Sequence, residues 1–250
     1  MTEDREPQII RAFVELSQEL IEDYDVIDML AQLTASCASL LDISSAGLLL
    51  GDSRGQLHLA AASSERTHHL ELFQLQRDEG PCLDSFHDGE PVSAPDLDAA
   101  AHRWPQFQRA ALDVGIRSVH ALPMRLKDNV LGAVGLFGDE TGDLHEDDLA
   151  LAQALVHVAS VAIVHERAAT DRASISALLD YALTSRIVVE QAKGALAYAG
   201  DLDMDDAFAV LRLYARDHRR KLSEVANEIV NRLLPYDDVL QHARSSASST

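Results

Sequence analysis

The chain has 250 residues, of which 47% are hydrophobic but only 5% aromatic, so its core must consist mainly of Leu, Val, Ile and Ala. Its formal net charge of −20 argues against a protein that attracts nucleic acid by bulk charge. The longest apolar run, residues 149–164, is interrupted by Gln153, His157 and Ser160, which argues against a membrane-spanning helix and a membrane partner.

The cysteines and the N-terminal residues favour a cytoplasmic protein. Cys37 and Cys82 do not form the closely spaced framework of a secreted, disulfide-rich domain, which suits reduced thiols. Acidic residues precede the first apolar stretch, so no signal peptide is expected. The length allows one mid-sized domain and one small domain.

Predicted strands and helices alternate over residues 13–137. Two pairs of strands flank short polar turns and predict β-hairpins, at residues 46–62 and 117–137. A shorter extended run lies at residues 91–94. The expected helices are residues 13–41, 65–76 and 105–114. Because hairpins dominate, we expect an α+β domain with a largely antiparallel sheet and helices on its faces.

Two segments of this region resemble a known family. They are GPCLDSFHDGEPVSAPDL at residues 80–97 and LGAVGLF at residues 131–137. Together with the order of the elements, they resemble a GAF domain over residues 13–165, preceded by an N-terminal extension at residues 1–12. The resemblance implies a sensor that binds a small molecule or a tetrapyrrole between the sheet and the helices. The candidate pocket residues are Cys82, Phe86, Asp96, Trp104, Phe107 and His120. In the alternative interpretation, the three aromatic residues are ordinary core side chains.

Cys82 follows Gly80-Pro81 at the start of a predicted helix, where the helix macrodipole favours the thiolate. Redox sensing through Cys82 is one hypothesis, and an inert buried thiol is the alternative. The 11 histidines are scattered without the spacing of a metal site, so we expect neither a metal nor a haem. The expected ligand is a small-molecule effector.

Residues 146–185 contain neither Pro nor Gly, and their apolar residues keep helical spacing. We expect a long helix that leaves the sensor and enters the C-terminal region, with a helical linker at residues 166–180 that pairs as a coiled coil. This pairing predicts a homodimer. The alternative is a helix that closes the sheet and then breaks near Thr170-Asp171.

Three short amphipathic helices are predicted in the C-terminal region. Asp203 is suited to cap the second of them, and Met204, Phe208, Leu211 and Ala215 then fall on one face. A similar apolar pattern runs from residue 222 to residue 233 and stops at Pro235. Short helices are marginal alone, so we expect their apolar faces to pack as an all-α bundle.

Motifs in this stretch resemble the ANTAR family. They are a Ser-Arg pair and QAKG within residues 185–194, AF at residues 207–208, LRLYAR at residues 211–216 and KLSEVA at residues 221–226. The resemblance covers residues 181–235 and departs at Ala197, where the family often has Met. It implies an output domain that binds paired hairpins in nascent transcripts and controls transcription termination. The Ser-rich tail, residues 236–250, is expected to be disordered.

The candidate RNA-binding residues are seven cations of this stretch and one aromatic residue: Arg186, Lys193, Arg212, Tyr214, Arg216, Arg219, Arg220 and Lys221. Cations hold phosphates, and Tyr214 is expected to stack on an unpaired base. Residues 180–235 carry 8 Lys and Arg against 9 Asp and Glu, so binding must depend on local placement of cations. The alternative is that these are solvated surface side chains.

Two other functions compete with RNA binding. The chain has no nucleophile elbow, no P-loop and no cysteine cluster, so we do not expect an enzyme. The nearer alternative is a DNA-binding helix-turn-helix regulator with a GAF ligand sensor, because residues 221–226 resemble the first helix of such a unit. No second helix is expected after Pro235, however, and Glu224 and Glu228 suit a recognition helix poorly.

Overall fold

The computed structural model describes residues 5–18, 25–165 and 172–247. The chain divides into two compact units. The first combines residues 1–23 with residues 29–180, and the second combines residues 24–28 with residues 181–250.

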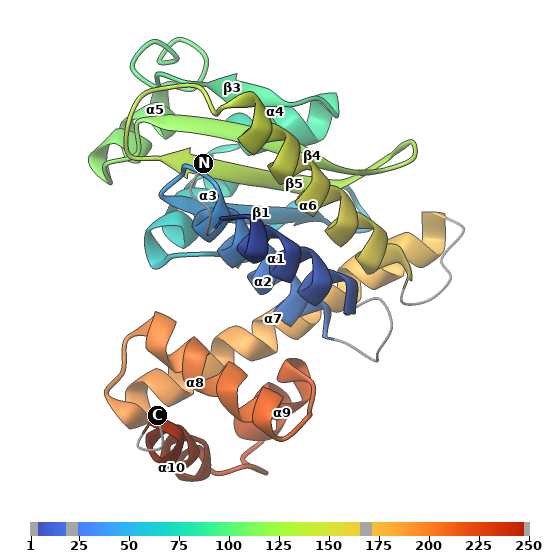
Figure 1. Ribbon diagram of the computed structural model, residues 1–250, viewed down its shortest axis with the longest axis vertical. Coiled ribbons are helices and arrows are strands. Elements are labelled where there is room, and N and C mark those ends of the chain that lie inside the picture. Colours follow the sequence, from blue (N-terminus) through green and yellow to red (C-terminus); the bar gives the residue numbers. More distant parts are fainter. Residues whose placement is uncertain (1–4, 19–24, 166–171, 248–250) are drawn as a thin grey trace. The chain divides into compact units, whose positions relative to one another are not determined.

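A five-stranded antiparallel sheet forms the centre of the first unit, with the strand order β2-β1-β5-β4-β3 (Figure 1). The strands are β1 Ser45–Gly51, β2 Leu57–Ala62, β3 Val92–Ala94, β4 Ser118–Leu126 and β5 Asn129–Gly138. Most residues of the central strand β5 are buried, because helices cover both faces of the sheet. The predicted antiparallel sheet with flanking helices is confirmed.

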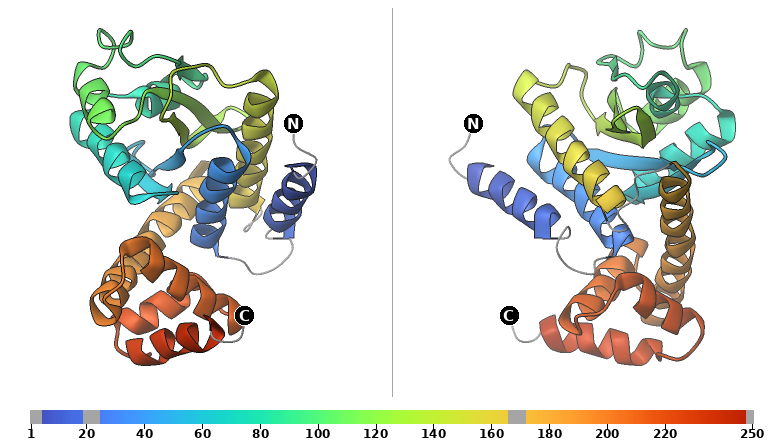
Figure 2. Two further views of the ribbon diagram at one scale, coloured as in Figure 1. Left: turned by 60° about the vertical axis from the view of Figure 1, so that its left-hand side comes forward. Right: turned by 90° about the vertical axis from the view of Figure 1, so that its right-hand side faces the viewer.

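The helices of the first unit form two layers. They are α1 Arg5–Gln18, α2 Val26–Leu40, α3 Glu65–Arg77, α4 Pro81–Asp88, α5 Pro105–Asp113 and α6 Glu146–His165. Helices α3, α4 and α5 lie on one face of the sheet, whereas α6 and the part of α2 from Met29 lie on the other (Figure 2). Helix α1 packs against α6.

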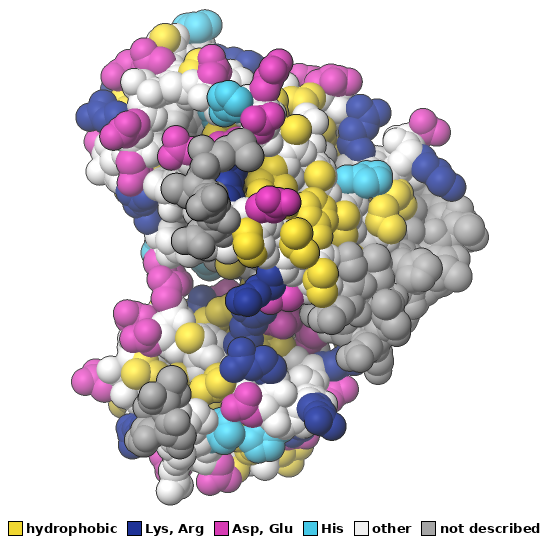
Figure 3. Space-filling model, in the orientation of Figure 1, with side chains coloured by type: hydrophobic (Ala, Val, Ile, Leu, Met, Phe, Trp, Pro, Cys, Tyr) yellow, Lys and Arg dark blue, Asp and Glu magenta, His cyan; other side chains and the backbone are white. Residues whose placement is uncertain are grey.

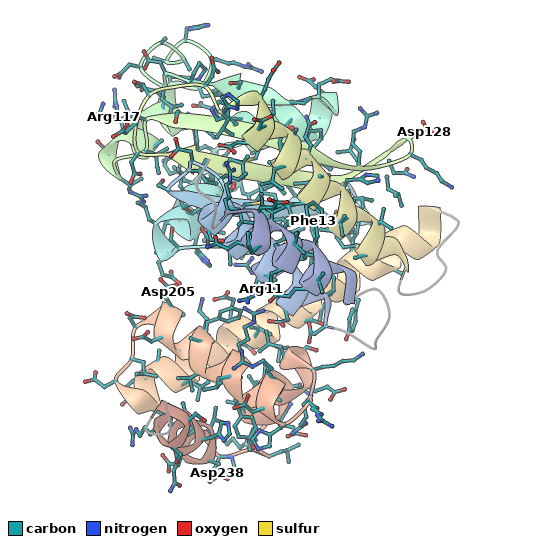
Figure 4. The ribbon with its side chains drawn as sticks, viewed as in Figure 1. Arg11, Phe13, Arg117, Asp128, Asp205 and Asp238 are labelled. Atoms are coloured by element: carbon teal, nitrogen blue, oxygen red, sulfur yellow. The ribbon has the colours of Figure 1, made fainter. Side chains whose placement is uncertain are left out.

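Both predicted hairpins form, and their turns explain why. The Asp52 carboxylate accepts hydrogen bonds from the N–H groups of Arg54 and Gln56, at 2.9 and 2.8 Å, and Gly55 takes the left-handed φ of 78° that the β1–β2 turn requires. Lys127 adopts a φ of 53° in the β4–β5 turn, beside Asp128 (Figure 4).

The single helix predicted over residues 13–41 is wrong. Helix α1 already begins at Arg5, inside the predicted N-terminal extension, and α2 starts anew at Val26. The Asp25 carboxylate accepts the Ile27 N–H at 2.9 Å, which is the bond of an N-cap. Apolar periodicity continues on both sides of Asp25, so it did not reveal the new helix start.

The second unit is all-helical. Its helices are α7 Arg172–Gly200 (from Tyr181), α8 Met204–Asp217, α9 Leu222–Val230 and α10 Tyr236–Ala247. Asp203 caps α8 as predicted, accepting the Asp206 N–H at 2.7 Å. Leu196, Leu211 and Val225, from three different helices, have no exposed surface. The predicted three-helix bundle is therefore present.

The predicted disordered tail is wrong, because residues 236–247 form helix α10. Its first turn carries Asp237 and Asp238, which suit the positive end of the helix dipole (Figure 4). Val239 is fully buried and Leu240 is 5% exposed, and the helix packs against α8. Two adjacent apolar residues are enough to hold α10 in place because they pack against α8. The mostly polar sequence of residues 236–250 did not indicate this contact.

The predicted linker lies partly outside the described residues. Helix α6 ends at His165 and α7 begins at Arg172, and residues 166–171 lie outside the described residues. The continuous helix and its coiled coil therefore stay predictions. Among the helices described, none is long and apolar enough to cross a membrane.

Candidate nucleic-acid interface

Arg186 and Lys193, both on α7, are buried, with exposed fractions of 8% and 6%. Glu190 lies between them. Its carboxylate is 3.5 Å from the Arg186 guanidinium and 3.1 Å from the Lys193 ammonium. Lys193 also lies 6.0 Å from the centre of the Phe208 ring. The two residues are seven apart and therefore lie on one side of the helix, but that side faces inward, so neither of these candidate RNA-binding residues is a surface cation.

The cations of α8 and the following turn differ widely in their availability. The Arg216 side chain is 73% exposed, and Arg219 is exposed at a left-handed φ of 52°. Arg220 instead donates two hydrogen bonds to the Glu228 carboxylate, at 2.9 and 2.7 Å. Lys221 is half-buried and forms the N-cap position of α9. On the face of this unit that Figure 3 shows, basic and acidic side chains lie among one another.

Arg212 is engaged by an acidic residue from far along the sequence. Its guanidinium forms a two-point contact with the Asp28 carboxylate, at 2.5 Å through Nε and 3.5 Å through Nη2. Asp28 belongs to the same compact unit as Arg212. Of the predicted cations, Arg216 and Arg219 therefore have the most exposed positions.

Tyr214 is not an open stacking platform. Its ring stacks on His218, with 4.0 Å between ring centres and 20° between planes, and meets His242 of α10 edge-on at 5.4 Å. His242 in turn lies 3.0 Å from the Asp217 carboxylate, a hydrogen bond that lowers the pKa of Asp217. Stacking of a base on this face of Tyr214 would require His218 to move.

A buried polar cluster in the first unit was missed by sequence reasoning. The fully buried Glu71 of α3 accepts a hydrogen bond from Gln74 at 2.7 Å, and the Cys82 thiol lies 3.5 Å from its other oxygen. Gly47 and Gly135 are paired on neighbouring strands, and a Cβ atom on either would lie within 3 Å of Glu71. Burial raises the pKa of Glu71 to about 8. The paired glycines were the only signal in the sequence.

The comparisons with known proteins identify both units. Residues 23–164 match the family model of the GAF domain, and residues 177–230 match that of the ANTAR domain. The chain belongs to the GAF family and carries an ANTAR domain. No curated protein matches this chain in sequence.

Solved structures support the GAF fold of the first unit. The GAF domain of an Acinetobacter phosphoenolpyruvate-protein phosphotransferase is 16% identical, with a TM-score of 0.50, and the match covers 69% of this chain and 99% of that one. The free methionine-R-sulfoxide reductase of Neisseria meningitidis is 17% identical, also with a TM-score of 0.50, over 68% and 96% of the two chains. At this identity, the likeness shows the fold alone.

Inside the GAF domain, the six predicted pocket residues do not line one pocket. Cys82, Trp104 and Phe107 belong to the hydrophobic core, against which Phe86 packs, so these side chains fill the space between sheet and helices. Asp96 is exposed and accepts the Asp98 N–H. The core alternative for the three aromatic residues is the one that the structure supports.

His120 instead lines a separate polar cavity of about 370 Å³, with Asp42, Ser118 and residues 138–144 among its walls. Its ring nitrogen Nδ1 is 2.9 Å from the Ser93 hydroxyl. Burial lowers the pKa of His120, which favours the neutral ring. The described residues include no group of three or more His, Cys, Asp or Glu side chains that could hold a metal ion.

For Cys82, the structure supports the alternative of an inert buried thiol. Burial raises the pKa of this thiol well above its usual value, and the neighbouring Glu71 raises it further. The helix dipole at the start of α4 does stabilise an anion, but the free-energy cost of removing a thiolate from water is larger than this stabilisation. Cys82 is therefore a protonated, buried thiol.

Proposed function

We propose that this protein is a signal-responsive RNA-binding regulator of transcription termination and antitermination in the cytoplasm. Its ANTAR domain binds paired hairpins in nascent transcripts, and its GAF domain controls this binding in response to a small molecule. The observation that carries the proposal is the ANTAR match to residues 177–230 on a chain that also holds a sensor domain. The role is regulatory rather than enzymatic.

The exposed cations set the expected mode of binding. Arg216 and Arg219 are exposed and suited to phosphate contacts, and the half-buried Lys221 follows them closely in the sequence, whereas Arg186 and Lys193 stabilise the bundle from within. The stretch from residue 180 to residue 235 is near neutral, so long-range attraction adds little. A single ANTAR domain should bind weakly, and two domains on two adjacent hairpins should bind much more tightly.

An uncharged stripe on α7 supports a homodimer. The exposed residues in the described part of this helix are all uncharged: Ala177, Tyr181, Thr184, Ile187, Gln191, Tyr198 and Ala199. Thr184, Gln191 and Tyr198 are seven residues apart, the repeat of a coiled-coil seam. Each copy of the chain carries a net charge of −20, so an uncharged surface is where two copies can meet with the least electrostatic repulsion. We expect Ile187→Glu with Tyr198→Glu to halve the mass measured by light scattering; an unchanged mass contradicts this interface.

The effector is expected to be a small molecule, since small-molecule binding is common among GAF domains. The cavity at His120 is one place where the effector could bind. Binding between the sheet and α4 would instead require the side chains of the filled core to rearrange. No metal or haem is part of the proposal.

A DNA-binding helix-turn-helix remains the alternative, and α10 bears on it. A helix does follow α9 after a short connection, contrary to the sequence prediction. The N-terminal turn of a recognition helix contacts bases and phosphates, but α10 begins with Asp237 and Asp238. Two carboxylates at that point would repel DNA.

The test compares three ligands at matched salt: an RNA with two adjacent hairpins, the same RNA with one hairpin, and duplex DNA. The variant Arg216→Gln, Arg219→Gln, Lys221→Gln should lose at least tenfold in affinity for the double hairpin. The charge-matched control is Arg54→Gln, Arg109→Gln, Lys127→Gln, three exposed cations of the GAF domain. Equal losses in the two variants, or tighter binding to DNA than to RNA, would contradict the proposal.

A further inference from the structure

Helix α9 receives its N-terminal cap from a distant part of the chain. Lys221, at its N-cap position, makes no side-chain capping bond. The Ser223 N–H instead donates to the Asp25 carboxylate at 2.6 Å, across 198 positions of sequence. Asp25 is 8% exposed, and its other oxygen caps the start of α2. One carboxylate therefore serves the positive ends of two helices.

Asp28, one turn further along α2, contacts the same domain. It holds Arg212 at two points, and both side chains are about one-third exposed. Together, the first turn of α2 places two carboxylates on the ANTAR domain, one at a helix N-terminus and one on a guanidinium fork. Helix N-termini and guanidinium forks are also the groups with which proteins bind phosphate.

The first turn of α2 is covalently connected to the GAF domain, so a change in that domain can reach it. Residues 24–28 belong to the unit that contains the ANTAR domain, whereas α2 continues from Met29 in the GAF unit. A rearrangement of α2 in the GAF domain would therefore pull directly on Asp25 and Asp28.

We propose that Asp25 and Asp28 occupy phosphate-binding positions of the ANTAR domain, so that the first turn of α2 is an autoinhibitory contact which must withdraw before RNA binds. This inference rests on the proposed function and names its control element. Carboxylate and phosphate compete for the Ser223 N–H and for Arg212. Release of the turn removes both competing carboxylates at once.

The contact is suited to release because it is poorly compensated. Burial raises the pKa of Asp28, Arg212 only partly opposes that effect, and the neighbouring Asp25 adds repulsion. An ion pair that loses its hydration without full compensation adds little net stability. A modest difference in effector binding between two states can then shift the population.

The experiment measures double-hairpin RNA affinity of the full-length chain. Asp25→Asn with Asp28→Asn should bind at least tenfold more tightly than Glu90→Gln with Asp139→Asn. The control removes two carboxylates that pair with Arg125 and Arg66 in the GAF domain. Asn removes the negative charge that competes with phosphate, while its one amide oxygen can still cap α2 and so protect the fold. Equal or weaker binding by the released variant than by the control overturns the autoinhibition.

A double-mutant cycle identifies the released group. Arg212→Gln should lower affinity at least fivefold more in the Asp25→Asn, Asp28→Asn background than in the otherwise unchanged chain, because there the Asp28 carboxylate no longer competes with phosphate for Arg212. No difference between the two backgrounds overturns the proposal.

Hydrogen exchange tests the proposal on the unaltered chain, by comparing amide exchange rates with and without RNA. RNA should speed exchange in the peptide that covers residues 25–30, and unchanged or slower exchange there overturns the proposal. Failure of every variant to prefer the double hairpin over an unrelated polyanion would contradict the proposed function itself. Hairpin binding with no effect of release would contradict only the autoinhibition.

Discussion

The GAF and ANTAR domains bury ionisable groups in opposite ways. In the GAF domain, Glu71 is fully buried beside an amide and a thiol, so it is held as the neutral acid. In the ANTAR domain, Arg186 and Lys193 are buried around the carboxylate of Glu190, so their charges remain and are paired. Neutralisation and pairing are the two ways to reduce the cost of burying charge. The stability of the two domains should therefore respond differently to pH and to substitution of these residues.

The largest expected effect comes from removing the buried acid. At pH 7, Glu71→Gln should raise the free energy of unfolding by about 3 kcal/mol, because the unfolded chain gains stability by ionising Glu71 while the folded chain holds it neutral. The pKa is about 8 in the folded protein, against an ordinary value of 4.5.

The same pKa shift sets a pH window. The stabilising effect of neutral Glu71 is complete below pH 4.5 and is lost as the pH rises to about 8. Urea unfolding from pH 5 to pH 9 should show this decline in the unchanged chain and a flatter profile in Glu71→Gln. Identical profiles would mean that Glu71 is ionised in the folded state.

Removing the carboxylate of the paired cluster should have the opposite sign. Glu190→Gln leaves Arg186 and Lys193 without their shared carboxylate and should lower the free energy of unfolding by about 2 kcal/mol. This is less than for a fully buried pair, because the Glu190 side chain is one-third exposed. The control is Glu224→Gln, an exposed carboxylate on α9. A loss no larger than the control's would show that other contacts hold both cations.

Exposed and buried cations should differ in the salt dependence of RNA binding. Arg216→Gln should weaken binding about fivefold and reduce the slope of log affinity against log salt by about 0.7 to 0.9, the value for one phosphate contact. Lys193→Gln should instead act mainly on stability. Filter binding at several salt concentrations separates them. A slope change for Lys193→Gln as large as that for Arg216→Gln would mean that the bundle opens to bind RNA.

The smallest expected effect concerns the thiols. Burial raises the pKa of Cys37 to about 12 and that of Cys82 well above its usual value. Neither should react with iodoacetamide at pH 8 until the chain unfolds, as followed by mass spectrometry with and without urea. Rapid modification of Cys82 in the folded protein would restore the redox hypothesis.

Local patterns in the sequence were sufficient for most of the elements and for both families. Alternating residues around the Asp52 turn predicted the first hairpin, and the apolar spacing after Asp203 predicted α8. The motifs at residues 185–226 indicated the ANTAR domain. These signals are carried by neighbouring residues, so they are visible without the rest of the molecule.

Only the tertiary structure decided which charges are available. Helical spacing places Arg186 and Lys193 on one side of α7, but the neighbouring helices determine that this side is buried. The Asp25 cap on α9, the Asp28 contact with Arg212 and the packing of α10 all join residues distant in sequence. Periodicity describes one element at a time, whereas exposure and pairing depend on what packs against it, and that is set by the fold as a whole.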